Sequence, residues 1–300
     1  MKISLTKSGE YTARIYLILS MFIFGTIGIF RRYIPLPSGA LAMLRGIVGA
    51  AALLLIMFII KKPPNIRKLK SNLLLLIISG ALIGFNWIFL FEAYNYTSVA
   101  TATLCYYMAP VFVLIASPIF LKEKLNLKQI LCSITAIIGI VLVSGVFNQK
   151  SVDNKNEFIG VLFGLAAAIL YASVIILNKK ITNTNSLDRT VFQLGSAGIV
   201  ILPYSLVFEG FEGVSLEINH IILIIIICLI HTTLAYYLYF SAIKSTKAVA
   251  AAIFSYIDPV VAIILSALIL NENLNLFTVL GSFLILGSTF INEIKIKKVW

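Results

Sequence analysis

The sequence predicts an all-α integral membrane protein whose ten transmembrane helices form two inverted five-helix repeats. The composition is 60% hydrophobic and only 12% charged, whereas about 25% of the residues in a soluble domain are charged. Apolar runs of about 20 residues recur along the chain, and each is long enough to cross the ~30 Å hydrocarbon core of a bilayer. A long segment of the first half also returns in the second half, which indicates an internal duplication.

The duplicated segment runs from Phe91 to Ser133 and returns without a gap from Phe240 to Ser282. Roughly a third of the aligned positions are identical at one constant offset, which is typical of an internal repeat. Similar composition alone would match leucine to leucine, but not a proline, a glutamate and an asparagine at fixed mutual spacing. The identical pairs include Ala93 and Ala242, Thr97 and Thr246, Tyr107 and Tyr256, Pro110 and Pro259, Ser117 and Ser266, Glu123 and Glu272, and Asn126 and Asn275.

Ten apolar runs are expected to cross the membrane as helices. Their approximate ranges are 13–30, 39–60, 72–93, 98–121, 127–146, 158–178, 187–208, 219–241, 247–270 and 275–293. Asn126 and Asn275 stand just before two of these runs, so each is expected to cap the N-terminus of a helix. The polar stretch 148–157 joins the halves, which predicts a first repeat over 1–147 and a second over 158–300.

Lysine and arginine are distributed unevenly between the two sides of the membrane. One side collects clusters such as those around Lys61 and Lys122, whereas the other has few cations, among them Arg32. The positive-inside rule therefore predicts that both termini are cytoplasmic. Because each repeat has an odd number of spans, the second repeat enters from the opposite side. Glu272 is then expected at the outer end of the ninth helix, and its counterpart Glu123 at the cytoplasmic end of the fourth.

Several function classes are disfavoured. The net charge of +12 does not indicate nucleic-acid binding, because the cations lie in short loops and no polar domain is present to carry such binding. The sequence contains no Walker-type loop, no Gly-x-Ser-x-Gly elbow and no His-Glu-x-x-His pair, and no cofactor or metal site is expected. Cys105, Cys132 and Cys228 fall inside apolar runs without metal-ligand spacing, so they are expected to be buried free thiols.

A set of short motifs recurs in a fixed order along the chain. It consists of Leu44 and Arg45 in the second helix, Ala93, Thr97 and Ser98 before the fourth, the mid-helix prolines Pro110 and Pro259, and the Glu-x-Leu ends at Glu123–Leu125 and Glu272–Leu274. Together these features resemble the drug/metabolite transporter superfamily, and within it the EamA-type ten-helix branch. The resemblance covers essentially the whole chain and implies a carrier of small metabolites with a central cavity. In the second repeat, Gln193 stands where alignment on the second helix would place an arginine, so the arginine is not duplicated.

Asp258 and His231 are polar residues predicted near the middle of the membrane, where they are costly and therefore candidates for function. Asp258 directly precedes Pro259, and the first repeat has the uncharged Ala109 in its place. The carboxylate either binds a cationic group or coupling proton, or is a structural group hydrogen-bonded between helices. His231 either shares a proton with Asp258, meets the substrate, or is a satisfied packing residue.

Arg45 and Glu92 are predicted in the outer halves of the second and third helices. Their depths allow an ion pair, which would make both charges tolerable in a low dielectric. The sequence favours a structural or gating pair. The alternative is that Arg45 binds a substrate carboxylate while Glu92 gates its exit.

Aromatic and amide side chains at interior depths form a second candidate constellation. Rings with polar tips suit a pocket for an amino acid or aromatic metabolite, although any membrane bundle contains some interior tyrosines. Pro110 and Pro259 are expected to break their helices, because a proline frees a backbone carbonyl one turn earlier. The predicted substrate-binding residues are Asn86, Trp87, Tyr107, Tyr171, His231, Tyr236, Tyr256 and Asp258.

The inverted duplication favours a secondary transporter that moves a small metabolite across the cytoplasmic membrane by alternating access. Export of amino acids or related compounds is preferred, mainly through the resemblance. An uptake carrier for a cationic or sugar-like metabolite and a non-transporting membrane receptor remain alternatives. An intramembrane enzyme is disfavoured because only one acid is predicted at the midplane. The expected partners are a small-molecule substrate and membrane lipid. The sequence leaves open whether a proton is coupled to transport and whether the protein is a monomer or a homodimer.

Overall fold

A computed structural model describes residues 7–120, 122, 125–143, 154–209, 214–243 and 254–293, and every described element is a helix. Most of the predicted linker lies outside these residues, and its last part, 154–157, forms the first turn of α8. The elements are α1 Lys7–Arg32, α2 Ser38–Ile59, α3 Ile66–Lys70, α4 Leu73–Tyr96, α5 Val99–Tyr106, α6 Ala109–Phe120, α7 Leu127–Val143, α8 Asn154–Lys180, α9 Ser186–Tyr204, the π-helix η1 Ser205–Glu209, α10 Ile218–Ile226, the π-helix η2 Ile227–Leu234, α11 Ala235–Ile243, α13 Ile257–Ile269 and α14 Leu276–Glu293.

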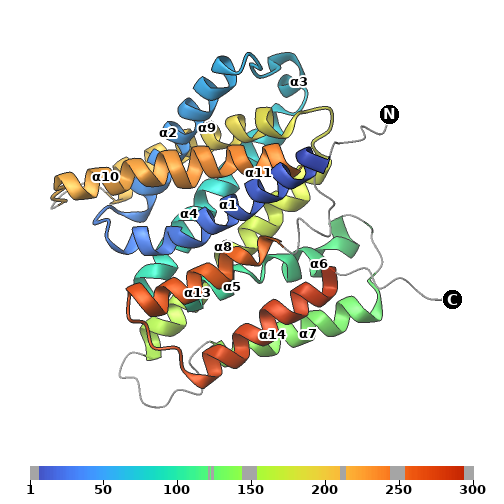
Figure 1. The fold of residues 1–300 in the computed structure, drawn as a ribbon, viewed down its shortest axis with the longest axis vertical. Coiled ribbons are helices and arrows are strands. Elements are labelled where there is room, and N and C mark those ends of the chain that lie inside the picture. Colours follow the sequence, from blue (N-terminus) through green and yellow to red (C-terminus); the bar gives the residue numbers. More distant parts are fainter. Residues whose placement is uncertain are drawn as a thin grey trace.

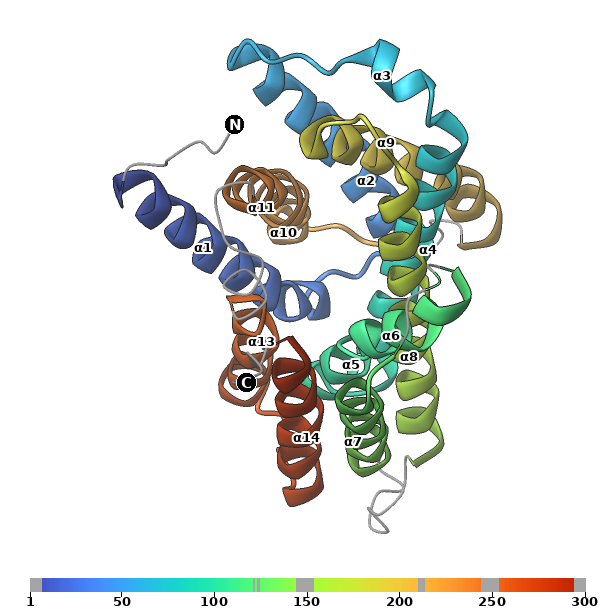
Figure 2. The ribbon, with the colours of Figure 1, turned by 90° about the vertical axis from the view of Figure 1, so that its right-hand side faces the viewer.

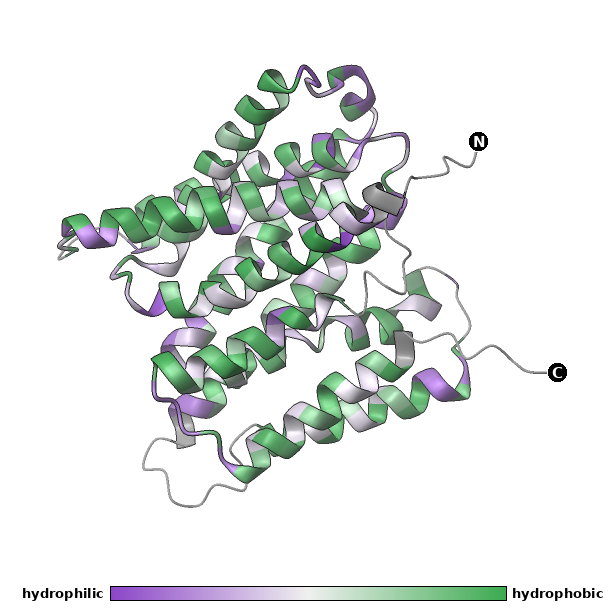
Figure 3. Cartoon of the chain, viewed as in Figure 1, coloured by the Kyte–Doolittle hydropathy of each residue, from purple (hydrophilic) through white to green (hydrophobic). Residues whose placement is uncertain are grey.

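These elements form the ten predicted membrane helices. Within the described ranges, seven helices are long and apolar enough to span a bilayer, and three shorter apolar helices accompany them. The long spans include α5 with α6, α9 with η1, and α10 through α11. Figure 3 shows hydrophobic residues along the helices and hydrophilic ones gathered mainly at helix ends and loops. The prediction of an all-α membrane protein is confirmed.

Asparagine caps begin two of the helices, as predicted. The side chain of Asn126 accepts a hydrogen bond from the Gln129 backbone N–H at 2.9 Å, and the Gln129 side chain accepts one from the Asn126 N–H at 2.9 Å. Asn275 accepts from the Thr278 N–H at 2.8 Å. Each cap satisfies donors that have no partner within the helix.

Equivalent helices of the two repeats pack directly on each other. α2 lies along α9 and α7 lies along α14, at opposite ends of the helix array in Figures 1 and 2. Glycines permit the close approach: a Cβ on Gly46 would lie 2.5 Å from the Gly198 nitrogen, and one on Gly281 would lie 2.7 Å from the Gly139 carbonyl oxygen. Small residues at such crossings let backbones come together.

Other contacts come in matched pairs. α4 packs on α8, and its counterpart α11 packs on α1, which is the counterpart of α8. The arrangement is the one expected when two repeats are related by a two-fold axis in the membrane plane.

The two membrane spans that carry Pro110 and Pro259 are both interrupted just before the proline. α5 ends at Tyr106 and α6 begins at Ala109, so Pro110 is the second residue of α6. In the other repeat Tyr256 is a turn residue, and Pro259 is the third residue of α13. A proline is tolerated in the first turn of a helix, where its missing N–H would have no partner anyway. The interruptions leave two helix starts inside the membrane region, one from each repeat.

Candidate functional site

Arg45 is a buried cation from the first repeat. It lies on α2 with 3% of its surface exposed, and its Nε donates to the Thr232 hydroxyl oxygen at 3.1 Å. The guanidinium carbon lies 4.1 Å from the centre of the Trp87 ring and 5.3 Å from that of Phe91. Arg45 therefore joins α2, α4 and η2 in the interior of the bundle.

Local structure explains how Thr232 reaches Arg45. In η2 the Thr232 hydroxyl donates to the Ile227 carbonyl at 3.0 Å, five residues back. Gly49 lies one turn after Arg45 on α2, and a Cβ there would lie 2.6 Å from the Thr232 methyl group. The glycine thus lets η2 approach α2. π-Helical turns of this kind are often found at functional sites.

Asp258 is a carboxylic acid from the second repeat, in the first turn of α13, and it is partly exposed. Its hydrogen-bonding partner is Tyr107 of the first repeat, whose hydroxyl also donates to the Ser255 carbonyl at 3.0 Å. α1 crosses closely here, since a Cβ on Gly25 would lie 2.5 Å from the Asp258 carbonyl oxygen. The carboxyl group is therefore held where the two repeats meet.

Tyr94 and Tyr106 both lie near Asp258 and near Arg45. Tyr106 lies against Tyr171, with ring centres 5.4 Å apart. The interior thus presents a cation from one repeat, an acid from the other, and tyrosines shared by both. Such convergent polar groups among aromatic walls are typical of sites for small molecules.

Tyr236 and Tyr256 occupy different surroundings. Tyr236 packs edge-on against Phe24 of α1 at 5.3 Å and interacts electrostatically with Arg45. Tyr256 packs edge-on against Phe290 of α14 at 5.7 Å. The structure therefore places Tyr236 beside the cation and Tyr256 near the seam between α13 and α14.

His231 and Asn86 are buried polar residues that connect helices. His231 is 1% exposed, its Nε2 lies 2.8 Å from the Thr26 hydroxyl, and its ring packs edge-on against Phe30 at 4.8 Å. Asn86 is also 1% exposed and donates to the Ala167 carbonyl at 2.6 Å. Both side chains hold neighbouring helices together, and the structure does not bring His231 onto Asp258.

The structure also does not bring Arg45 and Glu92 together. The half-buried Glu92 accepts a hydrogen bond from Asn95 at 3.3 Å. Among the described side chains, the one ion pair joins Arg32 and Glu272.

That pair belongs to a second polar cluster, at the end of the bundle where α1 and α13 end and α5 begins. We call Arg32, Glu272 and the first turn of α5 the α5 clasp. Arg32 Nη2 lies 3.3 Å from Glu272 Oε1 and donates to the Thr97 carbonyl at 2.7 Å. Glu272 accepts from the Val99 N–H at 2.9 Å. A carboxylate on a helix N-terminus is favourable because the free N–H groups carry partial positive charge.

The turn after α13 directs Glu272 to this position. Asn271 has a φ of 52°, a left-handed conformation that asparagine adopts more readily than most residues. The Glu272 N–H then bonds back to the Ser266 carbonyl at 3.2 Å. Lys122, at the matching place in the first repeat, has a φ of 56°. The following residue, Glu123, lies outside the described residues.

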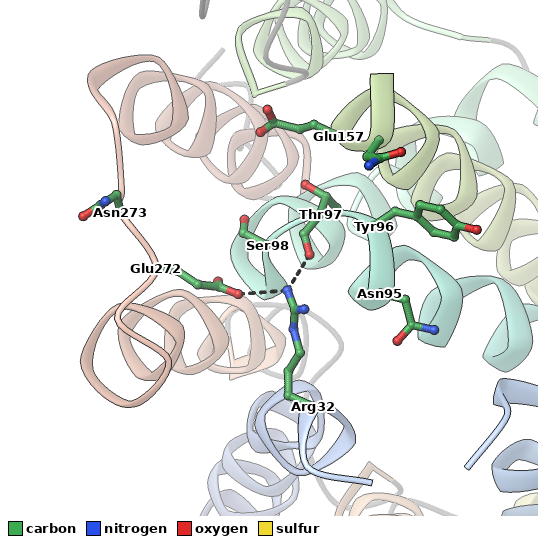
Figure 4. Close-up of a pocket in the computed structure, with 9 residues that line it drawn as sticks. Arg32, Asn95, Tyr96, Thr97, Ser98, Glu157, Glu272 and Asn273 are labelled. Carbon is green, nitrogen blue, oxygen red and sulfur yellow. Dashed lines mark hydrogen bonds and ion pairs between the residues drawn. The ribbon is translucent and has the colours of Figure 1, made fainter. Parts of the chain in front are cut away.

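The α5 clasp forms one wall of a cavity of about 520 Å³. Figure 4 shows Arg32 directed toward Glu272 and the Thr97 carbonyl, with Asn95 to one side and Glu157 on the far side of Thr97. The residues that line it all carry polar or charged side chains: Arg32, Asn95, Tyr96, Thr97, Ser98, Asn156, Glu157, Glu272 and Asn273.

Sequence reasoning named the members of the α5 clasp without finding their contact. Thr97 and Ser98 were a family feature and Glu272 a repeated helix end, whereas Arg32 appeared only as an outer cation. The duplication of Glu272 was the available signal that its position matters. In the part of the chain that the structure describes, no three His, Cys, Asp or Glu side chains gather as a metal site.

The family model that matches the chain is that of the EamA-like transporter family, and it matches twice, over residues 12–145 and 158–293. The uncharacterized transporter YxxF of Bacillus subtilis (strain 168) is 28% identical over 292 residues, which cover 97% of this chain and 93% of the relative. Protein PecM of Dickeya dadantii (strain 3937) is 26% identical over 220 residues, 72% of each chain. One crystal structure superposes with a TM-score of 0.65 at 15% identity, over 94% of this chain and 96% of the other, which shows a shared fold. The chain is therefore a multi-pass membrane protein that belongs to the EamA-like transporter family.

Proposed function

We propose that this protein is a secondary transporter that exports amino acids or related small metabolites across the cytoplasmic membrane by alternating access. Membership of a transporter family supports the carrier role and leaves the cargo open. The charges in the interior of the bundle support the cargo class, and the contacts between its two repeats support the mechanism.

One observation carries the proposal: the two repeats contribute opposite charges to one tyrosine-lined interior. Arg45 comes from the first repeat and Asp258 from the second, and neither forms an ion pair with a described residue. Both interact with Tyr94 and Tyr106. An amino acid carries a carboxylate and an ammonium group, so its two charges complement this interior. A charged group is costly in the interior of a membrane protein. A charge without an ion-pair partner there is therefore a candidate for ligand binding.

The α5 clasp supports alternating access. It joins α1 and the start of α5 in the first repeat to the end of α13 in the second. If the repeats rock against each other, these contacts must break for that end to open. The distribution of lysine and arginine predicts that this end faces outward, so opening the α5 clasp would release the cargo outside.

The test is efflux from cells that express the chain and are loaded with dipeptides, followed by flux measurements in proteoliposomes. Asp258→Asn probes the charged interior, Tyr256→Ala probes the neighbouring turn before α13, and Asp188→Asn is the matched control. Asp188 is a buried carboxylate that accepts from the Asn65 N–H at 3.1 Å, outside the interior site. We expect Asp258→Asn to lower amino-acid efflux about 10- to 100-fold, as the loss of a hydrogen bond to a charged group implies.

Two outcomes would count against the proposal in different ways. Flux at the wild-type rate in both Asp258→Asn and Tyr256→Ala would show that the site is wrong. An absence of amino-acid efflux from the wild-type protein would show that the function is wrong.

A further inference from the structure

The Arg45 guanidinium is a buried cation that no described carboxylate neutralises. A guanidinium has five N–H donors, and among the described residues only the Nε donor of Arg45 has a hydrogen-bond acceptor, Thr232. The neighbours that influence Arg45 electrostatically are Tyr236, Cys228, Tyr106 and Tyr94. Three of these four neighbours are tyrosines, so the polar side chains near the guanidinium are mainly phenols.

Aromatic contacts compensate this charge only in part. Trp87 and Phe91 lie under the guanidinium at 4.1 and 5.3 Å, and such cation–π contacts offset a fraction of the cost of removing an ion from water. A planar guanidinium with free donors on its edges matches a carboxylate, which accepts two parallel hydrogen bonds.

Two other interior groups show how the chain satisfies polar side chains that have no ligand. Arg31 also lies over the Phe91 ring, at 5.7 Å, but it donates to the Ile34 carbonyl at 2.8 Å and to the Ser38 hydroxyl at 3.1 Å. Gln193 occupies the place that matches Arg45 in the second repeat, and its amide nitrogen donates to Ser79 at 2.6 Å and to Asn178 at 2.8 Å. Of these three side chains, Arg45 alone has a single hydrogen-bonded donor within the described structure, although the Nε of Arg31 also lacks a partner.

We infer that Arg45 binds the carboxylate of the transported compound, and that the rest of the compound extends past Tyr94 and Tyr106 toward Asp258. This inference rests on the proposed function and narrows the substrate class to compounds that carry a carboxylate. It assigns to Arg45 a binding role in place of the gating pair with Glu92. Thr232 acts as a positioning residue, because it fixes the guanidinium through Nε and leaves the other edge for the ligand.

The test uses the fluorescence of Trp87, which lies under the guanidinium. The chain has two tryptophans, so Trp300→Phe leaves Trp87 as the reporter. Each of the twenty protein amino acids is titrated into the full chain in detergent, beside its amide and its decarboxylated amine. We expect the carboxylate forms to bind at least about tenfold more tightly than the amides, because a charge-assisted bidentate contact is lost.

Arg45→Gln and Arg45→Lys test the residue, and Arg31→Gln is the matched buried arginine. We expect Arg45→Gln to abolish the preference for carboxylates and Arg45→Lys to reduce it, whereas Arg31→Gln retains it at the wild-type ratio. If Arg45→Gln does not fold, the ratio of carboxylate to amide affinity in the wild-type protein and in Arg45→Lys still tests the inference.

Equal affinity for carboxylates and amides in the wild-type protein, an unchanged preference in Arg45→Lys and Arg45→Gln, or no carboxylate binding at all would overturn the inference. The proposed function is judged separately, by flux in proteoliposomes. If amines are transported and Arg45→Gln does not change their flux, this inference is wrong and the transport function stands. If carboxylates bind at Arg45 but no flux is measured, the binding site stands and the transport function is wrong.

Discussion

The α5 clasp and the interior around Arg45 each contain an arginine guanidinium, but they surround it with different partners. In the α5 clasp, Arg32 meets a carboxylate at 3.3 Å and a backbone carbonyl at 2.7 Å. In the interior, Arg45 meets one hydroxyl and two aromatic rings. The more exposed arginine is thus the better satisfied by the protein, although burial makes an unsatisfied charge more expensive.

Under the proposed function, the Arg32 pair holds the protein in one conformation, whereas Arg45 binds a ligand. The α5 clasp pairs its two charged groups across the two repeats, so its contacts favour a closed end. The interior leaves donors of Arg45 unused and leaves Asp258 without an ion pair, so it favours binding of a molecule with complementary charges. The predictions below test whether each region behaves as its contacts suggest.

The largest effect is expected from Glu272→Ala, which removes the carboxylate that joins Arg32 to the start of α5. Hydrogen bonds to charged groups contribute about 1.5–3 kcal/mol, so the open population should rise about 10- to 100-fold. The readout is the labelling rate of Ala100→Cys, a position that is fully buried in the closed structure, with a membrane-impermeant thiol reagent.

Glu217→Ala is the control for this experiment, because Glu217 is exposed and pairs only locally with His220. The unsubstituted chain reports background, since Cys105, Cys132 and Cys228 are buried. A labelling rate that Glu272→Ala leaves unchanged would show that the α5 clasp does not close this end.

A smaller effect is expected from Arg32→Gln. The Arg32 side chain is 33% exposed and that of Glu272 is 13% exposed, and exposed ion pairs contribute at most about 1 kcal/mol. Glu272 keeps its bond to the Val99 N–H, so labelling of Ala100→Cys should rise only about two- to fivefold. If Arg32→Gln raised the labelling rate more than Glu272→Ala does, Arg32 and not Glu272 would contribute more to closing this end.

The smallest effect on binding is expected from Asn86→Ala. Asn86 was predicted to line the substrate site, whereas its amide bonds the Ala167 carbonyl between α4 and α8. The substitution should lower the free energy of unfolding by about 1–3 kcal/mol, because a buried acceptor loses its donor, and should leave ligand selectivity unchanged. Thermal denaturation and the Trp87 titration measure the two quantities, and a changed carboxylate preference would return Asn86 to the site.

Much of the fold followed from local patterns in the sequence. Apolar length located the membrane helices because the bilayer imposes one thickness on all of them. Asn126 and Asn275 were predictable as caps because a cap acts on backbone groups only three residues away. The duplication with an odd number of spans made the repeats inverted, since each crossing reverses the direction of the chain.

The sequence by itself determined the helices, their number and the relation between the repeats, whereas the partners of the charged groups were decided only by tertiary structure. Glu272 and Val99 are 173 positions apart, and Arg45 and Thr232 are 187 apart. Depth in the membrane suggested Glu92 as the partner of Arg45, but depth leaves the direction around each helix open. That direction depends on where Gly46 and Gly49 let neighbouring helices approach α2. Close packing between helices, which no local pattern encodes, assigned Glu272 to the α5 clasp and left Arg45 facing the interior.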